Sequence, residues 1–162
     1  MQEIEIKRSD VNLLRKIMPL ICLIIPWEVY FYSSYSSGWG IKFSVFYANF
    51  DATYGTIFVD LFQQMSLLSN GGFLPSVRTL GWIFGAILCV ALAIYELSRK
   101  NIELVLETKT TTHILIACGI LTAISSLAVW NSTFKTLPIA PFFFIAFGYL
   151  LLKAEKEEKD MA

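Results

Sequence analysis

The chain has 162 residues, of which 56% are hydrophobic and only 16% are charged, and its 13 basic residues balance its 13 acidic residues. A soluble domain of this size needs a charged surface around its core, and about 25% charged residues is typical of such domains. The apolar excess therefore predicts a membrane protein, and the zero formal charge argues against nucleic acid as a partner.

Four apolar runs have the length of a transmembrane helix. A helix needs about 20 consecutive apolar residues to cross the hydrocarbon of a bilayer. Runs of this kind cover residues 12–33, 79–97, 112–131 and 134–153. Prolines in the first and last runs are compatible with membrane helices, in which neighbouring groups satisfy the freed carbonyls. The predicted fold is an all-α membrane protein, a four-helix transmembrane bundle that forms one integral membrane domain over 1–162.

The lysines and arginines set the predicted orientation. Ten of them lie at or before the start of the first run, between the second and third runs, and at or after the end of the fourth run, whereas Lys42, Arg78 and Lys135 lie on the other side. Short cytoplasmic loops are enriched in basic residues. Both termini are therefore predicted to be cytoplasmic, with segment 34–78 outside, in a multi-pass protein of the cell (plasma) membrane.

Segment 34–78 is predicted to form an outer cap over the helices. Residues 41–50 alternate loosely between apolar and polar positions, which indicates either a strand or an extended strip on the helix tops. Residues 54–69 change to helical spacing and predict an amphipathic helix whose apolar face is buried. The apolar face of this helix comprises Phe58, Leu61, Phe62, Met65 and Leu68.

Glu28 is the polar residue most out of place, because it follows ten apolar positions of the first run. A carboxylate inside a membrane costs several kcal/mol unless it is paired, neutral or hydrated. Arg78 and Lys135, at the outer ends of the second and fourth runs, are its candidate partners. Two interpretations stay open: a structural ion pair or headgroup contact, and a functional ion or proton site.

Small residues recur at every fourth position of the second run, where they form a candidate helix-packing face. Such a stripe lets two helix backbones approach closely. The face serves either a partner subunit or the chain's own bundle, since the third run carries small residues of its own. The stripe consists of Gly81, Gly85, Cys89 and Ala93.

Asn131 is a candidate glycosylation site. It is followed by Ser132 and Thr133, which completes the acceptor motif for N-glycosylation. The motif lies in the short turn that is predicted to be outside the cell.

No motif for a metal, a cofactor or a catalytic group is present. Cys22, Cys89 and Cys118 lie in three separate apolar runs, and His113 is the only histidine. Zinc sites and histidine-based catalysis both need several such residues at defined spacings. The sequence therefore predicts no metal, no cofactor and no enzymatic activity.

Several short motifs occur in a characteristic order between about residues 20 and 150. They are Ile25-Pro26-Trp27, Phe50-Asp51-Ala52-Thr53, Phe58-Val59-Asp60-Leu61-Phe62, Leu74-Pro75 and Leu137-Pro138-Ile139. In this order the chain resembles a family of small four-span archaeal membrane proteins of unassigned function, some of which are encoded near archaeosortases. The resemblance implies a cell-envelope setting in an archaeon.

The long first outer segment and the short second one are also similar in shape to claudin-like tetraspan proteins. The first loop of that group carries a GLW motif and a cysteine pair. Here Gly38-Trp39 stands without the rest of the motif, and the segment has no cysteine. The likeness is therefore one of shape only.

These features predict a non-enzymatic integral membrane protein that acts as a subunit or scaffold of a larger cell-envelope assembly. Its expected partners are membrane lipid and a protein in the membrane, either a different subunit or further copies of the chain. The alternative is a small transporter or channel, in which Glu28 is an intramembrane ion or proton site.

Overall fold

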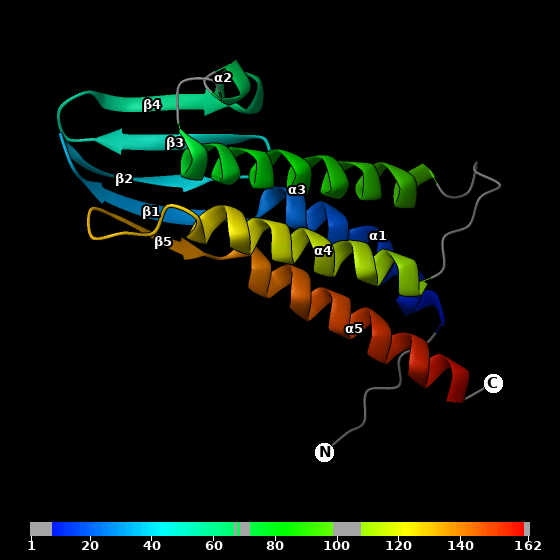
Figure 1. The fold of residues 1–162 in the computed structure, drawn as a ribbon. Helices are drawn as coiled ribbons and strands as arrows, with labels where there is room; N and C mark the ends of the chain where they lie inside the picture. Colours follow the sequence, from blue (N-terminus) through cyan, green and yellow to red (C-terminus); the bar gives the residue numbers. More distant parts are fainter. Residues whose placement is uncertain (1–7, 67, 69–71, 99–107, 161–162) are drawn as a thin grey trace.

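The computed structural model describes residues 8–66, 68, 72–98 and 108–160, which form five helices and five strands (Figure 1). The helices are α1 (Arg8–Ile24), α2 (Leu61–Ser66), α3 (Phe73–Ser98), α4 (Thr108–Leu127) and α5 (Ala140–Asp160). The strands are β1 (Glu28–Ser33), β2 (Ser37–Lys42), β3 (Phe46–Asp51), β4 (Gly55–Asp60) and β5 (Phe134–Pro138).

The strands form one antiparallel sheet in the order β4-β3-β2-β1-β5. The first four follow one another as a meander, and β5, which comes about 100 residues after β1, completes the sheet on the far side of β1. Asp51 closes the last hairpin by accepting hydrogen bonds from the backbone N–H groups of Thr53 and Tyr54. Gly55 supplies the positive φ of 77° that the turn requires.

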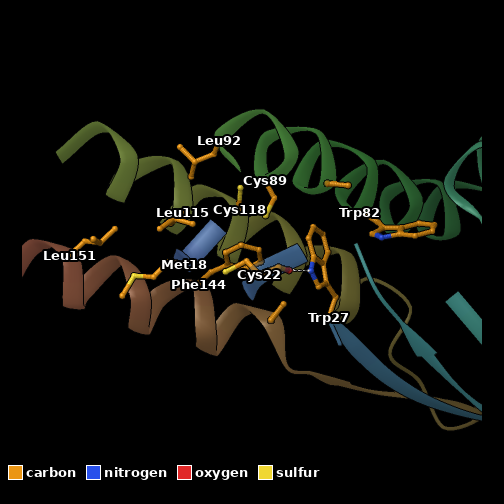
Figure 2. Close-up of a cluster of buried hydrophobic side chains, with 12 residues drawn as sticks. Met18, Cys22, Trp27, Trp82, Cys89, Leu92, Leu115, Cys118, Phe144 and Leu151 are labelled. Carbon is orange, nitrogen blue, oxygen red and sulfur yellow. Dashed lines mark hydrogen bonds between the residues drawn. The ribbon is translucent and has the colours of Figure 1, made fainter. Parts of the chain in front are cut away.

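The four long helices pack side by side, and the sheet continues beyond one end of their bundle (Figure 1). The bundle encloses an apolar core (Figure 2). Trp27 lies at its sheet end, where the indole N–H donates to the carbonyl of Cys22 at 2.7 Å and the ring meets Phe144 edge-on. Trp27 thereby holds the connection between the end of α1 and the start of β1 in place.

The predicted all-α, four-span fold is wrong, because the chain contains a five-stranded sheet. Only α3 and α4 are long and apolar enough to cross a membrane, by length and composition, among the residues that the structure describes. Helix α1 has 17 residues and ends at Ile24, and the apolar part of α5 is the shorter stretch Ala140–Ala154. The first and last apolar runs each combine a helix with a strand, which a hydropathy window cannot distinguish.

The predicted amphipathic helix over 54–69 is also wrong in its first half and in its burial. Residues 55–60 form strand β4, and Asp60 and Gln63 then start α2 with reciprocal side-chain bonds to each other's backbone N–H groups. Phe58 and Phe62 are 66% and 80% exposed and Met65 is also exposed. The spacing of these side chains matched a helical stripe, but the strand places Phe58 on the outer side of the sheet.

Segment 41–50 is divided between two strands. The N–H of Phe43 donates to the carbonyl of Phe46 at 2.8 Å, and this turn joins β2 to β3. Of the two interpretations of this segment, the strand is the one that the structure shows.

Candidate functional site

The inner face of the sheet carries the polar residues of the candidate site. Side chains alternate between the two faces of a strand. In β1 this places Glu28 and Tyr30 on the face that is covered, and the register sets Lys42 opposite Glu28 and Gly40 opposite Tyr30. Strands β1 and β2 thus contribute to one buried polar surface beside the start of α3.

Glu28 is 1% exposed and binds three side chains. The Arg78 guanidinium donates to Oε1 through Nη2, the Lys42 Nζ lies 3.4 Å from Oε2, and the Ser126 hydroxyl donates to Oε2 at 2.9 Å. These partners come from α3, β2 and α4, so the carboxylate joins the sheet to two helices. We call Glu28, Lys42, Arg78 and Ser126 the outer ion cluster.

Of the candidate polar site named from the sequence, the structure brings Glu28 and Arg78 together and leaves Lys135 apart. Lys135 is exposed and pairs in register with Phe31, on the opposite face of the sheet from Glu28. Lys42 takes the place expected of Lys135, and from the sequence Lys42 is only a charge outside the predicted spans. The alternation through Gly38, Gly40 and Lys42 could have indicated it, given the register of the β1–β2 hairpin.

Burial and charge oppose each other in this cluster. Burial alone would raise the pKa of Glu28, but Lys42, Arg78 and the Ser126 hydroxyl together lower that pKa below its ordinary value. Burial, and after it the charge of Arg78, lower the pKa of Lys42 to about 7 against the opposing effect of Glu28. The pKa of Glu28 falls because its carboxylate faces two cations. The pKa of Lys42 falls because Lys42 is more deeply buried than Arg78 and lies beside that second cation.

A cavity of about 360 Å³ lies next to the outer ion cluster, between the inner sheet face and the first turns of α3. Its wall combines two cations with aromatic rings. The Arg78 guanidinium lies 4.9 Å from the ring centre of Tyr30 and 4.6 Å from that of Phe134, and the Lys42 Nζ lies 5.1 Å from that of Trp82. Such cation–π contacts hold the cations in place without neutralising them.

Helix α2 closes one side of this cavity through Gln64. The Tyr47 hydroxyl donates to Oε1 of Gln64 at 3.0 Å, and Nε2 of Gln64 donates to the Thr79 hydroxyl at 3.2 Å. The bridge ties β3, α2 and α3 together around the cavity. Of the predicted apolar face of the cap, Leu61 packs against the core and Leu68 is half-buried, whereas Phe58, Phe62 and Met65 point away from it.

Two glycines of β2 make room for the tyrosine rings of β1. Gly40 lies opposite Tyr30 and Gly38 opposite Tyr32 in the register. A Cβ on either glycine would collide with the ring of its partner. The rings therefore lie across the glycines, and this arrangement gives the cavity an aromatic floor.

The small-residue stripe of α3 is buried within the chain itself. Gly81, Gly85, Cys89 and Ala93 are all buried, and a Cβ added to Gly81 would lie 3.0 Å from that of Ser125 on α4. Gly85 of α3 lies against Thr122, which is also on α4. Of the two open interpretations of this face, packing within the chain's own bundle is the one that the structure shows.

A second buried ion cluster, which the sequence analysis missed, lies toward the other end of the bundle. Arg15 Nη2 of α1 lies 3.0 Å from Oε1 of Glu96 on α3, and the Thr111 hydroxyl of α4 donates to the same oxygen at 2.9 Å. We call Arg15, Glu96 and Thr111 the inner ion cluster. The available signal was Glu96, an acidic residue inside the second apolar run, which needs a partner for the same reason as Glu28.

The remaining candidate residues are the three cysteines, which lie in the core, and Asn131, which lies in a turn. Cys22, Cys89 and Cys118 are buried free thiols in the core. In the part of the chain that the structure describes, no group of three or more histidine, cysteine or acidic residues could hold a metal ion. Asn131 is exposed, and its Oδ1 accepts hydrogen bonds from the N–H groups of Thr133 and Phe134 in the turn before β5.

Comparison with known proteins identifies no family. No family model matches the chain, and no curated protein matches its sequence. The function is therefore inferred from the geometry of the molecule.

Proposed function

We propose that this chain is a non-enzymatic, multi-pass protein of the cell membrane that acts as a subunit or scaffold of a larger cell-envelope assembly. The observation that carries the proposal is the apolar side of the sheet that faces away from the cavity. We call it the outer sheet face, and its large exposed side chains are Phe31, Trp39, Phe46, Phe58 and Leu137.

The outer sheet face arises because side chains alternate between the two faces of each strand. In β1 and β2 the residues that alternate with the inward-facing ones point outward, and these include Phe31 and Trp39, which pair in register. The exposed fractions of the five side chains lie between 38% and 66%, and Trp39 stacks on Phe50 of β3 with ring centres 4.3 Å apart. A monomer rarely leaves such a contiguous apolar surface uncovered, and aromatic residues are enriched where proteins meet.

The surfaces of α3 and α4 support placement in a membrane. Large apolar side chains point outward from both helices, for example Leu80, Phe84 and Ile87 on α3 and Ile120 and Ile124 on α4. The small and polar residues of the same helices point inward and pack against each other. This distribution fits helices that are surrounded by lipid, in which backbone groups are satisfied internally and small residues line the contacts.

The surroundings of Glu28 favour this proposal over a transporter. Both carboxylate oxygens of Glu28 already bind partners, and the outer and inner ion clusters are separated by the apolar core of the bundle. That core includes Cys22, Leu115, Cys118 and Phe144, each of which is fully buried (Figure 2). A conduction path needs polar or hydrated lining along its length.

Site-specific cross-linking in native membranes tests the proposal. A photo-reactive amino acid at Phe58 is expected to give a discrete cross-linked product, whereas the same group at Tyr54 gives none. Tyr54 is a suitable control because it is equally exposed but lies in the turn between β3 and β4. The product should also co-purify in mild detergent at fixed stoichiometry.

A different result would support the transporter. If the chain purifies without a partner, gives no product at Phe58, and carries an ion flux in liposomes that Glu28→Gln abolishes, the assembly role is refuted. Glu28→Gln preserves the size of the side chain, so a loss of flux would reflect the charge.

A further inference from the structure

The cavity beside the outer ion cluster has the size, charge and lining of a ligand site, independently of any assembly role. The geometry points to a binding site for a small hydroxylated monoanion, of the chemical class of a polyol phosphodiester. Such a group occurs both as the headgroup of an anionic lipid and as a free soluble molecule.

The shape of the cavity fits a ligand of that size. Its volume of about 360 Å³ lies in the range of about 300 to 1,000 Å³ that is usual for small-molecule sites. Its walls come from the sheet, from α2 and from the first turns of α3, so several elements hold the lining in place. Its lining residues on α3 are Arg78, Thr79 and Trp82, which lie near the start of that helix. Figure 1 shows this start of α3 at the sheet end of the bundle.

The charge balance selects an anion with one negative charge. Lys42 and Arg78 both line the cavity, whereas Glu28, which binds both of them, does not. One carboxylate thus offsets one of the two cations, and one positive charge remains toward the cavity when Lys42 is protonated. A phosphodiester carries one negative charge and accepts hydrogen bonds well from a guanidinium group.

Two buried polar atoms in the wall indicate which groups the ligand carries. Nε of Arg78 and Oδ1 of Asn49 have no hydrogen-bond partner within the described part of the chain, and both residues line the cavity. Buried polar atoms are normally paired, so each unpaired one needs an explanation. An anionic oxygen would accept from Arg78, and a ligand hydroxyl would donate to Asn49.

The aromatic lining suits the carbon skeleton of a polyol. The rings of Tyr30, Tyr47 and Trp82 contact the cavity and provide apolar faces between the polar groups. A site that mixes apolar faces with a few polar groups fixes both the orientation and the identity of its ligand. A hydroxylated chain that ends in one anionic group matches this lining.

Calorimetric titration of the purified chain with glycerophosphoglycerol, a soluble polyol phosphodiester, tests the site. Lys42→Met should weaken binding at least tenfold, and Lys135→Met, which removes a lysine from the outer sheet face, should change binding less than twofold. A second matched pair compares Gln64→Ala, which opens the cavity wall and should weaken binding, with Met65→Ala, which alters an exposed neighbour on α2 and should not. Lys42→Met removes a buried charge and keeps an unbranched side chain that is one atom shorter, so the variant should fold, as a melting curve would verify.

A second measurement identifies the source of the ligand. Chains in lipid nanodiscs are melted with phosphatidylglycerol or with phosphatidylcholine, whose headgroup has no net charge and no hydroxyl group. Stabilisation by phosphatidylglycerol in the parent but not in Lys42→Met indicates the lipid headgroup, and binding of the free probe alone indicates a soluble hydroxylated anion. The proposal is overturned if neither ligand binds, or if Lys42→Met binds as tightly as the parent.

Discussion

Removal of the Glu28 carboxylate should destabilise the protein strongly, because it leaves two buried cations facing each other. Breaking a buried ion pair by removal of one partner costs about 3 to 5 kcal/mol. Glu28 is fully buried, but part of Arg78 reaches the surface and Lys42 can release its proton, since its pKa is already about 7. We therefore expect Glu28→Ala to cost about 3 kcal/mol near pH 7, at the lower end of that range.

The expected cost corresponds to a measurable change in melting temperature. For a chain of this length, about 1 kcal/mol shifts the melting temperature by roughly 2 to 4 °C, so Glu28→Ala should melt about 6 to 12 °C below the parent. A thiol-reactive dye gives the readout in detergent, because Cys22, Cys89 and Cys118 are buried and become reactive only on unfolding.

The double variant separates loss of the ion pair from a general packing defect. Lys42→Met in the Glu28→Ala background removes one of the two uncompensated cations and should recover about half of the lost stability, as in a double-mutant cycle. If Glu28→Ala melts within about 2 °C of the parent, or if the double variant melts at the sum of the two single effects, the outer ion cluster does not act as described.

Three further predictions concern other parts of the molecule. The folded pKa of Lys42 is about 7, below its ordinary value of 10.5, so between these values Lys42 binds more protons in the unfolded state and its contribution makes stability rise with pH. Urea or thermal melts from pH 7 to 8, below the range in which most cysteine thiols of the unfolded chain ionise, should show this rise in the parent and a smaller one in Lys42→Met. Glu28 is ionised in both states over this window and adds nothing to the slope, because its folded pKa is lowered. Gly85→Leu should lower stability by about 1 to 3 kcal/mol, because a Cβ there would already lie 3.2 Å from Thr122 and from Trp27 and a larger side chain would separate α3 from its neighbours. The control is Ile87→Leu, on the exposed side of the helix. Equal melting of the two variants would contradict the packing. Glu96→Ala should cost about 3 kcal/mol through loss of the inner ion cluster, and a circular-dichroism melt that matches the parent would contradict this role.

The parts of the fold that depend on local composition could be predicted from the sequence. Helix α3 contains the whole second apolar run and α4 contains most of the third, because each run is long, apolar and uninterrupted by proline-rich segments. The stripe from Gly81 to Ala93 could be assigned to helix packing, because small residues four positions apart share one helix face. Both inferences need information from one segment only.

The sheet could not be predicted in the same way, because it depends on pairing between distant segments. Glu28–Ser33 is an apolar, aromatic stretch that continues the first run, and only its pairing with β2 and β5 makes it a strand. Strand β5 was assigned to the fourth run for the same reason. Hydropathy measures how apolar a segment is, and it does not report whether hydrogen bonds are made within a helix or between strands.

The candidate site was only partly accessible from the sequence. Arg78 could be named as a partner of Glu28, because a carboxylate in apolar surroundings needs a cation and few cations lie near the outer ends of the runs. Lys42 could not be distinguished from Lys135, because that choice depends on which face of the sheet each lysine occupies. The cavity depends on the same register and was not predicted.

The most direct test of the central claim is the mass of the chain in its native membrane environment. After extraction in a lipid-preserving polymer, native mass spectrometry should show a complex heavier than the 18.3 kDa chain at fixed stoichiometry. Phe58→Lys should release the chain from that complex without lowering its melting temperature, because the side chain is exposed on the outer sheet face. A parent chain that is extracted as an 18.3 kDa monomer, with Phe58→Lys indistinguishable from it, would contradict the account.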